Sequence, residues 1–396
     1  MLFSKSTDGV TEYSPLKKYY LPTFLIILFT TLAYFFVTFF LTRQDQVTEI
    51  QQPLVQQEAV NYEKDRNFEQ AGIQYQKNAN LATDKYEQAH YLVRSGNAYN
   101  RSGDYELGFS ILKSVEENPE LPPEIRAEAR LRMLQPYYVA RLKEPLQIVF
   151  SDSRYNYALQ GGSLQVLQDL ESALRISLEE IYQVIPSSYI NSLIAISYSA
   201  EALSNQNLSP TDKKELVAKT LEIINRGDLL SEKERVGIED YWNRPDPQDL
   251  AKDLWFAGQH MRFVALTFLS LVDRNLVSKV ENSYTELLPY YEGNRSLSRL
   301  GQRFWTNFYY AAFLAEVYGE SESNRIADLV KPFYETTGNY AQINMGEKGF
   351  WFFLSTELLR PVSEQSNNTR FIYKIATVVP QFNTFIKENF LTAENI

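Results

Sequence analysis

The sequence predicts an all-α protein in which one transmembrane helix precedes a series of antiparallel helix hairpins. Three observations support this fold class. Residues 19–42 carry no charged side chain, helix-start signals recur along the rest of the chain, and one pattern of small and aromatic residues occurs twice at a constant offset. The alternation of apolar and polar residues that marks strands is hard to find.

The transmembrane helix is predicted over residues 19–42. At about 1.5 Å per residue this run forms roughly 36 Å of helix, enough to cross a hydrocarbon core about 30 Å thick. A cleaved signal peptide is the alternative, but its apolar run is usually shorter and ends in small residues, whereas this run ends in FFVTFFLTR. We therefore expect an uncleaved anchor that contacts the lipid bilayer.

The charges beside the span predict its orientation. Lys5, Lys17 and Lys18 precede the span, and only Arg43 follows closely. Because positively charged flanks favour the cytoplasmic side, residues 1–18 are predicted to form a short cytoplasmic tail. The protein is then single-pass, with the bulk of the chain extracytoplasmic, in the periplasm or on the cell surface.

Two further segments complete this topology. Residues 43–58 contain six glutamines and are predicted to form a juxtamembrane spacer. The best rival to the span, Trp255–Val272, contains Gln259, His260 and Arg262, so its apolar stretch is too short for a second crossing. It is predicted to be a buried helix in which His260 has a hydrogen-bond partner.

The composition excludes several classes of site. The chain has no cysteine and two histidines, His90 and His260. Disulfides, thiolate metal sites and a cysteine nucleophile are therefore excluded, and a zinc site built on several imidazoles is impossible. The net charge of −10 disfavours nucleic acid as a partner. We predict neither a metal nor a cofactor.

Signals for helix ends recur after the spacer. Ser209 is a predicted N-cap followed by proline, and Gly227 is predicted to lie beyond the end of the same helix. Ser231–Glu234 has the spacing of a capping box, and Asp246 precedes another proline. Short connections between the helices favour antiparallel hairpins. Further helices are predicted over residues 163–185, 187–204, 276–291, 296–317, 321–336, 347–360 and 370–390.

The segment Ser95–Glu120 predicts a hairpin with a defined pattern. Small and aromatic residues flank a Gly-Asp-Tyr turn: Gly96, Tyr99, Gly103–Tyr105, Gly108 and Leu112. The small residues Gly96 and Gly108 let the two helices approach closely. A second copy lies 37 residues earlier and keeps the residue class at five positions: Ala59, Tyr62, Phe68, Ala71 and Tyr75.

This pattern resembles the tetratricopeptide repeat (TPR), a helix hairpin of about 34 residues. The resemblance is clear over residues 59–120, and it implies an α-solenoid, because such repeats stack to bury a shared core. We expect TPR-like helical repeats over residues 59–150 and a C-terminal helical-repeat domain, degenerate in pattern, over residues 163–396. The boundary is predicted within residues 152–162.

The resemblance also implies a partner-binding surface. In the family, the first helices of successive hairpins line a concave groove, and the matching positions here are His90, Val93, Asn97, Asn100 and Arg101. Asn97 matches a position whose amide often holds the backbone of a bound peptide. The alternative is a solvated helix face with nothing bound.

Signals for catalysis are weak. The chain has no phosphate-loop, nucleophile-elbow or metalloprotease motif. A carboxylate pair is the remaining option, since Glu171, Glu179 and Glu180 share one predicted helix. Glutamates on an amphipathic helix are usually its solvated face, so we predict no catalytic residue and no enzymatic activity.

Two aromatic clusters mark the C-terminal half. Phe304 and Trp305 belong to the first, and Phe350 and Trp351 belong to the second. They are interpreted either as core packing between helices or as an exposed apolar groove that takes a helix of a partner.

These observations predict a membrane-anchored extracytoplasmic scaffold for protein–protein interaction, a subunit or assembly factor of a cell-envelope complex. Its partners are expected to be other proteins of a membrane or envelope complex. Two alternatives stay open. One is an enzyme that processes envelope polymers with a carboxylate pair in a helical-domain cleft, and the other is a structural subunit of a secretion or pilus machine.

Overall fold

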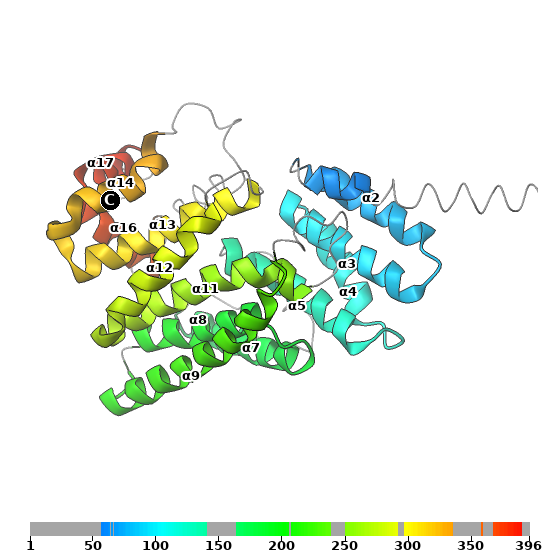
Figure 1. Ribbon diagram of the computed structural model, residues 1–396, viewed down its shortest axis with the longest axis horizontal. Coiled ribbons are helices and arrows are strands. Elements are labelled where there is room, and N and C mark those ends of the chain that lie inside the picture. The colour runs from blue at the N-terminus through cyan, green and yellow to red at the C-terminus, as the bar shows by residue number, and fades with distance from the viewer. Residues whose placement is uncertain are drawn as a thin grey trace, which may run out of the picture. The chain divides into compact units, whose positions relative to one another are not determined.

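A computed structural model describes residues 57–63, 65, 67–140, 164–205, 207–238, 250–291, 297–335, 358 and 367–389 (Figure 1). Every regular element in these ranges is a helix, which confirms the all-α fold class. The predicted tail, the span over residues 19–42 and most of the spacer lie outside the described residues, as do the predicted boundary, Asp246 and nearly all of the predicted helix 347–360. Residues 56–396 form one compact unit.

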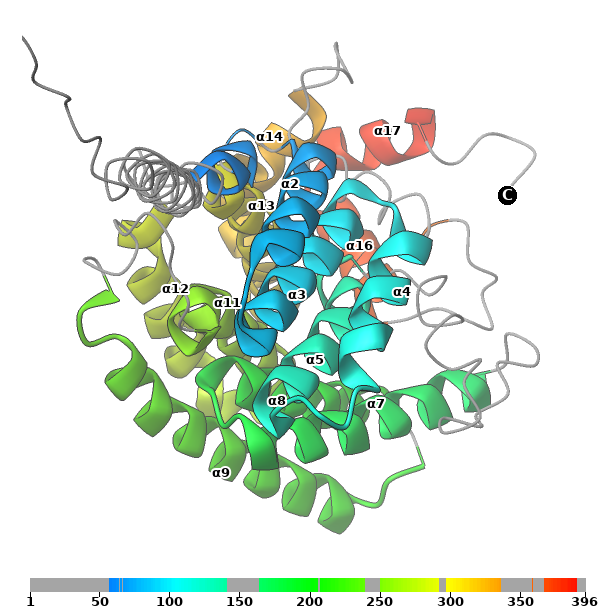
Figure 2. The ribbon, with the colours of Figure 1, turned by 90° about the vertical axis from the view of Figure 1, so that its right-hand side faces the viewer.

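Four helices follow the described helical residues 57–63, and consecutive ones pack against each other (Figure 2). They are α2 (Phe68–Leu81), α3 (Lys85–Ser102), α4 (Tyr105–Glu116) and α5 (Pro123–Ala140). The Gly-Asp-Tyr turn ends α3 and begins α4, as its residues predict. Gly103 ends α3 with φ of 96°, a left-handed conformation that glycine adopts without steric cost, and Asp104 Oδ1 accepts a hydrogen bond from Leu107 N at 3.2 Å to cap α4.

The close approach of α3 and α4 depends on two glycines. A Cβ added to Gly96 would lie 2.6 Å from Leu112 Cγ and 2.9 Å from the backbone oxygen of Gly108. A Cβ added to Gly108 would lie 2.8 Å from the backbone oxygen of Gly96. These distances confirm that small residues set the spacing of this hairpin. In the earlier copy, Ala59 and Ala71 are both fully buried.

The rest of the described chain is also helical. Its elements are α7 (Leu164–Val184), α8 (Ser188–Ser204), α9 (Pro210–Glu234), α11 (Leu250–Val272), η2 (Arg274–Leu276), α12 (Val277–Tyr291), α13 (Leu297–Val317), η3 (Gly319–Glu322), α14 (Ser323–Glu335), α16 (Asn367–Val378) and α17 (Pro380–Asn389). Helix α8 packs against α7, α9 and α11, and all its residues from Ser188 to Ser199 are buried. Apolar residues on every side of a helix favour this burial.

Helix α9 confirms one predicted cap and corrects two others. Ser209 Oγ accepts from Asp212 N at 3.1 Å, and Asp212 Oδ2 accepts from Ser209 N at 3.2 Å, which is a complete capping box. The helix does not end before Gly227, however, and Ser231–Glu234 forms its last turn rather than the start of another helix. Gly227 lies within α9 where this helix approaches α8 closely. A Cβ added to Gly227 would lie 3.3 Å from Asn191 Cβ of α8.

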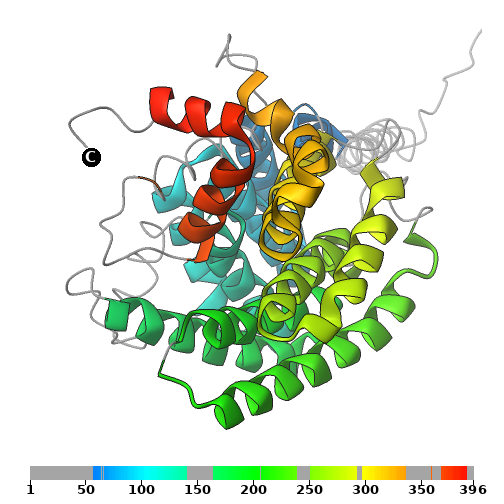
Figure 3. The same ribbon diagram turned by 90° about the vertical axis from the view of Figure 1, so that its left-hand side faces the viewer.

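The segment Trp255–Val272 forms most of α11, which packs against α8, α9, α12 and α13. Among the residues that the structure describes, no helix combines the length and apolar character needed to cross a membrane. The predicted helix over residues 370–390 is two helices, since Pro380 begins α17 after α16 ends at Val378. These two helices pack beside α13 and α14 (Figure 3).

Candidate functional site

Helix α3 carries the predicted partner-binding residues, and the structure divides them into two groups. His90, Asn97 and Arg101 are partly exposed. Val93 is fully buried, and Asn100 is only 6 % exposed. This corrects the prediction for Val93 and Asn100, because their side chains pack inside the fold and are not on a surface open to a partner.

Asn100 links three helices. Its Nδ2 donates to the backbone oxygen of Arg132 on α5 at 3.2 Å. A Cβ added to Gly108 of α4 would lie 2.2 Å from Asn100 Oδ1, so only glycine fits beside this side chain. The side chain therefore holds α3, α4 and α5 in register, which is a packing role.

The carboxylate of Glu63 is the centre of a polar cluster that sequence reasoning missed. It accepts a hydrogen bond from the Tyr75 hydroxyl at 3.1 Å. It also forms ion pairs with Arg94 at 3.5 Å and Arg101 at 3.6 Å. The cluster joins residues 57–63, α2 and α3. The sequence contains one signal for this cluster. Arg94 and Arg101 are seven residues apart, a spacing that places both on one face of a helix.

Both arginines of this cluster also lie over aromatic rings of α2. The Arg101 guanidinium carbon is 3.9 Å from the centre of the Phe68 ring, and that of Arg94 is 4.6 Å from the centre of the Tyr75 ring. Cation–π contacts of this kind stabilise the position of a guanidinium group. The two cations are therefore held by α2 as well as by Glu63.

Two of the three glutamates considered for catalysis, Glu179 and Glu180, have hydrogen-bond partners. Glu180 accepts from Arg130 at 2.7 Å, and Arg130 also binds Glu116 at 3.0 Å. Glu179 accepts from the Tyr198 hydroxyl at 2.9 Å. Arg130 thus ties α5 to both α4 and α7, and these carboxylates connect helices.

The first aromatic cluster packs into the core. Phe304 is partly buried with its ring centre 5.6 Å from that of Phe333 on α14, and Trp305 is 9 % exposed. Core packing is therefore the better interpretation for Phe304 and Trp305. Phe350 and Trp351 lie outside the described residues.

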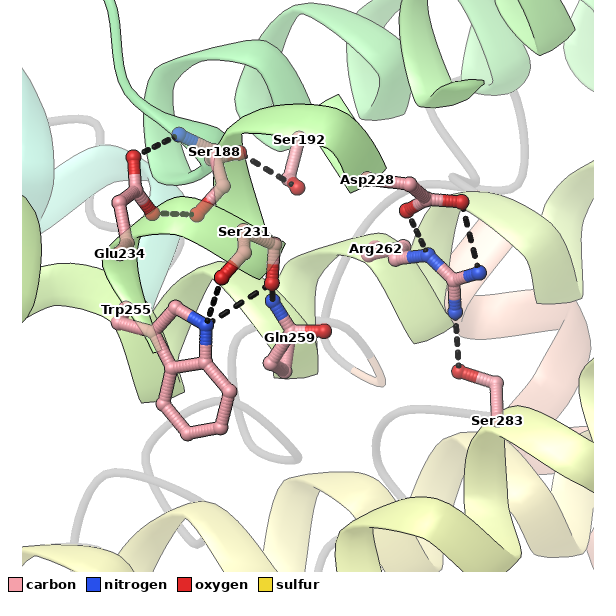
Figure 4. A network of polar contacts seen from close by, with 9 residues as sticks. All are labelled: Ser188, Ser192, Asp228, Ser231, Glu234, Trp255, Gln259, Arg262 and Ser283. Atoms are coloured by element: carbon pink, nitrogen blue, oxygen red, sulfur yellow. Dashed lines mark hydrogen bonds and ion pairs between the residues drawn. The ribbon is translucent and has the colours of Figure 1, made fainter. Parts of the chain in front are cut away.

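A buried carboxylate joins the end of α9 to the start of α8 (Figure 4). Glu234, at the end of α9, accepts a hydrogen bond from the backbone N–H of Ser188 at 2.8 Å and another from the Ser188 hydroxyl. Ser187 Oγ accepts from Ile190 N at 3.3 Å, so the first turn of α8 is capped twice. A negative charge at a helix N-terminus is also favoured by the helix dipole.

Helix α11 is joined to α9 by further polar contacts, also seen in Figure 4. The Ser231 hydroxyl accepts from Trp255 Nε1 at 2.8 Å and from Gln259 Nε2 at 2.6 Å. Arg262 forms two hydrogen bonds with the Asp228 carboxylate, at 2.5 and 3.0 Å. These part-buried hydrogen bonds join α9 to α11 at two points along the helices.

His260 has the buried partner that its sequence context predicts. Its Nδ1 lies 2.7 Å from Thr306 Oγ1 of α13, which lies 2.5 Å from the Tyr291 hydroxyl of α12. Burial lowers the pKa of His260 to about 4 and raises that of Tyr291. The neutral imidazole that burial favours can accept a hydrogen bond at Nδ1 from the Thr306 hydroxyl, which in turn can accept one from the Tyr291 hydroxyl.

This burial predicts a specific loss of stability in acid. The pKa of His260 is near 6.5 in the unfolded chain and about 4 in the folded chain. Between these pH values the imidazole is protonated in the unfolded chain and neutral in the folded chain. The free energy of unfolding should fall by about 1.4 kcal/mol per pH unit across this window. Urea unfolding of the native chain and of His260→Gln between pH 7 and 4.5 tests this. The free energy of unfolding of His260→Gln should fall less steeply as the pH is lowered. Equal dependence on pH in the two proteins would contradict the prediction.

Comparisons of the chain with protein-family models, with curated proteins and with solved structures find no match.

Proposed function

We propose that the protein is a membrane-anchored scaffold that binds other proteins outside the cytoplasm, as a subunit or assembly factor of an envelope complex. In this proposal residues 19–42 anchor the chain and the domain that follows is a TPR-like solenoid. The observation that carries the proposal is the partly exposed polar face of α3, with Asn97 and Arg101, on a hairpin held rigid by Gly96 and Gly108.

The packing of the first helices supports the repeat interpretation. Helix α3 packs against α2, α4 and α5, so successive hairpins stack on each other. The positions that match at the constant offset have matching roles, since Ala59, Ala71, Gly96 and Gly108 are all buried where helices meet. Stacks of this kind bind partners along an extended face.

The carboxylates of the domain favour a scaffold over an enzyme. Glu116 of α4 is held by Arg130 of α5 at 3.0 Å, and Glu234 of α9 is held by Ser188 of α8. A catalytic pair needs one acid whose proton is free to move to the substrate. Carboxylates that connect helices are suited to holding a rigid frame.

Membrane extraction and co-purification test the proposal. The full chain should resist extraction by alkaline carbonate, and the chain without residues 1–43 should be soluble and strongly helical by circular dichroism. The full chain purified from detergent-solubilised membranes should bring other proteins with it in a fixed ratio. Release of the full chain by carbonate would contradict the anchor, and a chain that purifies alone would contradict the scaffold.

A further inference from the structure

We propose that a cluster of hydrogen-bond donors on α12, α13 and α14 binds a carboxylate from an acidic segment of a partner protein. The cluster, here called the arginine–tyrosine cluster, comprises Tyr284, Arg303, Asn307, Tyr310 and Arg325. Helix α13 packs against both α12 and α14, which brings these residues together (Figure 1). This inference rests on the proposed scaffold function and names the chemistry of one partner segment.

Two stacked rings form the base of the cluster. The rings of Tyr284 and Tyr310 are nearly parallel, 11° apart, with their centres separated by 3.7 Å. Both tyrosines are buried, so the packing of α12 on α13 fixes their positions. The Tyr284 hydroxyl donates to Asn307 Oδ1 at 3.3 Å. Because this bond uses the amide oxygen, the Nδ2 of Asn307 remains a donor.

Two arginines lie beside this base. Arg325 Nη2 donates to the Tyr310 hydroxyl at 2.8 Å, and the guanidinium carbon is 5.0 Å from the centre of the Tyr310 ring. Arg303 precedes Asn307 and Tyr310 by four and seven residues, so these three share one face of α13. Burial raises the pKa of Tyr284, whereas the positive charges of Arg303 and Arg325 act to lower it. Both cations therefore lie near the Tyr284 hydroxyl.

The donors of the cluster outnumber its acceptors. Arg303 is exposed and has no hydrogen bond or ion pair with any residue that the structure describes. The side chain of Arg325 is 50 % exposed, and its ion pair with Glu322 is long, at 3.8 Å. The carboxylate of Glu281 already accepts from the Tyr318 hydroxyl at 2.9 Å. The cluster therefore presents two guanidinium groups to a partner.

These donors suit a carboxylate better than a phosphate. A guanidinium group pairs with a carboxylate through parallel hydrogen bonds. Burial raises the pKa of Tyr310 to about 12, so its hydroxyl stays protonated and can donate a further bond. A phosphate dianion is disfavoured because Glu281 acts on Tyr310 and Glu322 lies beside Arg325, and both would repel its second negative charge.

A hexaglutamate peptide labelled with fluorescein is the probe. It is titrated with the full chain in non-ionic detergent at low salt, and anisotropy reports binding. The chain with both Arg303→Gln and Arg325→Gln should bind the peptide at least about tenfold more weakly than the native chain, because two charge-assisted contacts are lost. Added sodium chloride should also weaken binding to the native chain, since it screens exposed charges. Circular dichroism checks that the variant remains folded.

Matched controls separate this site from general attraction between charges. Arg235→Gln removes an exposed positive charge at the end of α9 and should leave the affinity unchanged, whereas Arg303→Gln alone should weaken binding. Equal affinity of the native and doubly substituted chains overturns the inference. Displacement of the peptide by inorganic phosphate, more effectively than by glutarate at the same ionic strength, overturns the assignment to a carboxylate.

Co-purification distinguishes failure of this site from failure of the scaffold function. Partners that still co-purify with a native chain that does not bind the peptide reject the site alone. A native chain that binds the peptide but purifies from membranes without other proteins rejects the scaffold function, and with it the assignment of the carboxylate to a partner protein.

Discussion

Replacing Gly96 with valine is expected to lower the free energy of unfolding by about 3 kcal/mol. The new Cβ would lie 2.6 Å from Leu112 Cγ and 2.9 Å from the backbone oxygen of Gly108, so α3 and α4 must separate. Overpacking of this kind costs about 1–3 kcal/mol, and here a backbone atom cannot move aside. Urea unfolding followed by far-UV circular dichroism measures the loss.

The matched control adds the same side chain where there is room. Ser110→Val lies on the exposed side of α4 and should cost less than about 0.7 kcal/mol, the range of helix propensity. Equal losses for the two valines would show that the glycine does not set the helix spacing, and the repeat interpretation would lose its structural basis.

Replacing Glu234 with alanine is expected to cost about 3 kcal/mol. The carboxylate accepts two hydrogen bonds from Ser188 at the start of α8, and both donors are buried. Hydrogen bonds to a charged group contribute about 1.5–3 kcal/mol, and donors left without a partner add a desolvation penalty. Chemical unfolding measures the loss, and Glu234→Gln should recover part of it because the amide oxygen still accepts one bond.

The control for Glu234 lies two residues away on the same helix. Glu232 is exposed, so Glu232→Ala should change the free energy of unfolding by less than about 0.5 kcal/mol. If the two alanine variants lose the same amount, the cap of α8 does not stabilise the fold.

Local signals predicted helices well and long-range contacts poorly. Ser209 caps a helix because Pro210 and Asp212, its near neighbours, complete the start signal. Ser231–Glu234 has the same spacing but ends a helix instead. Its glutamate binds Ser188, 46 residues away, and no local pattern contains that contact. The predicted start was wrong because tertiary contact decided the role of these residues.

The candidate site shows the same limit. The repeat pattern correctly placed Gly96 and Gly108 at a helix contact, since close packing requires small residues there. Of the five residues predicted to line a groove, His90, Asn97 and Arg101 are partly exposed, whereas Val93 and Asn100 are buried. Asn100 is buried and donates to the backbone oxygen of Arg132 on α5, a contact 32 residues away that no local pattern contains.

The most direct measurement of the scaffold proposal is site-specific photocrosslinking of the full chain in its own membranes. A photoreactive residue at Asn97 tests the face of α3, and one at Ser110 tests the opposite helix of the same hairpin. We expect a discrete crosslinked band from Asn97 that contains another protein, and no such band from Ser110. Equal labelling at the two positions, or none at Asn97, would contradict a partner-binding face on α3.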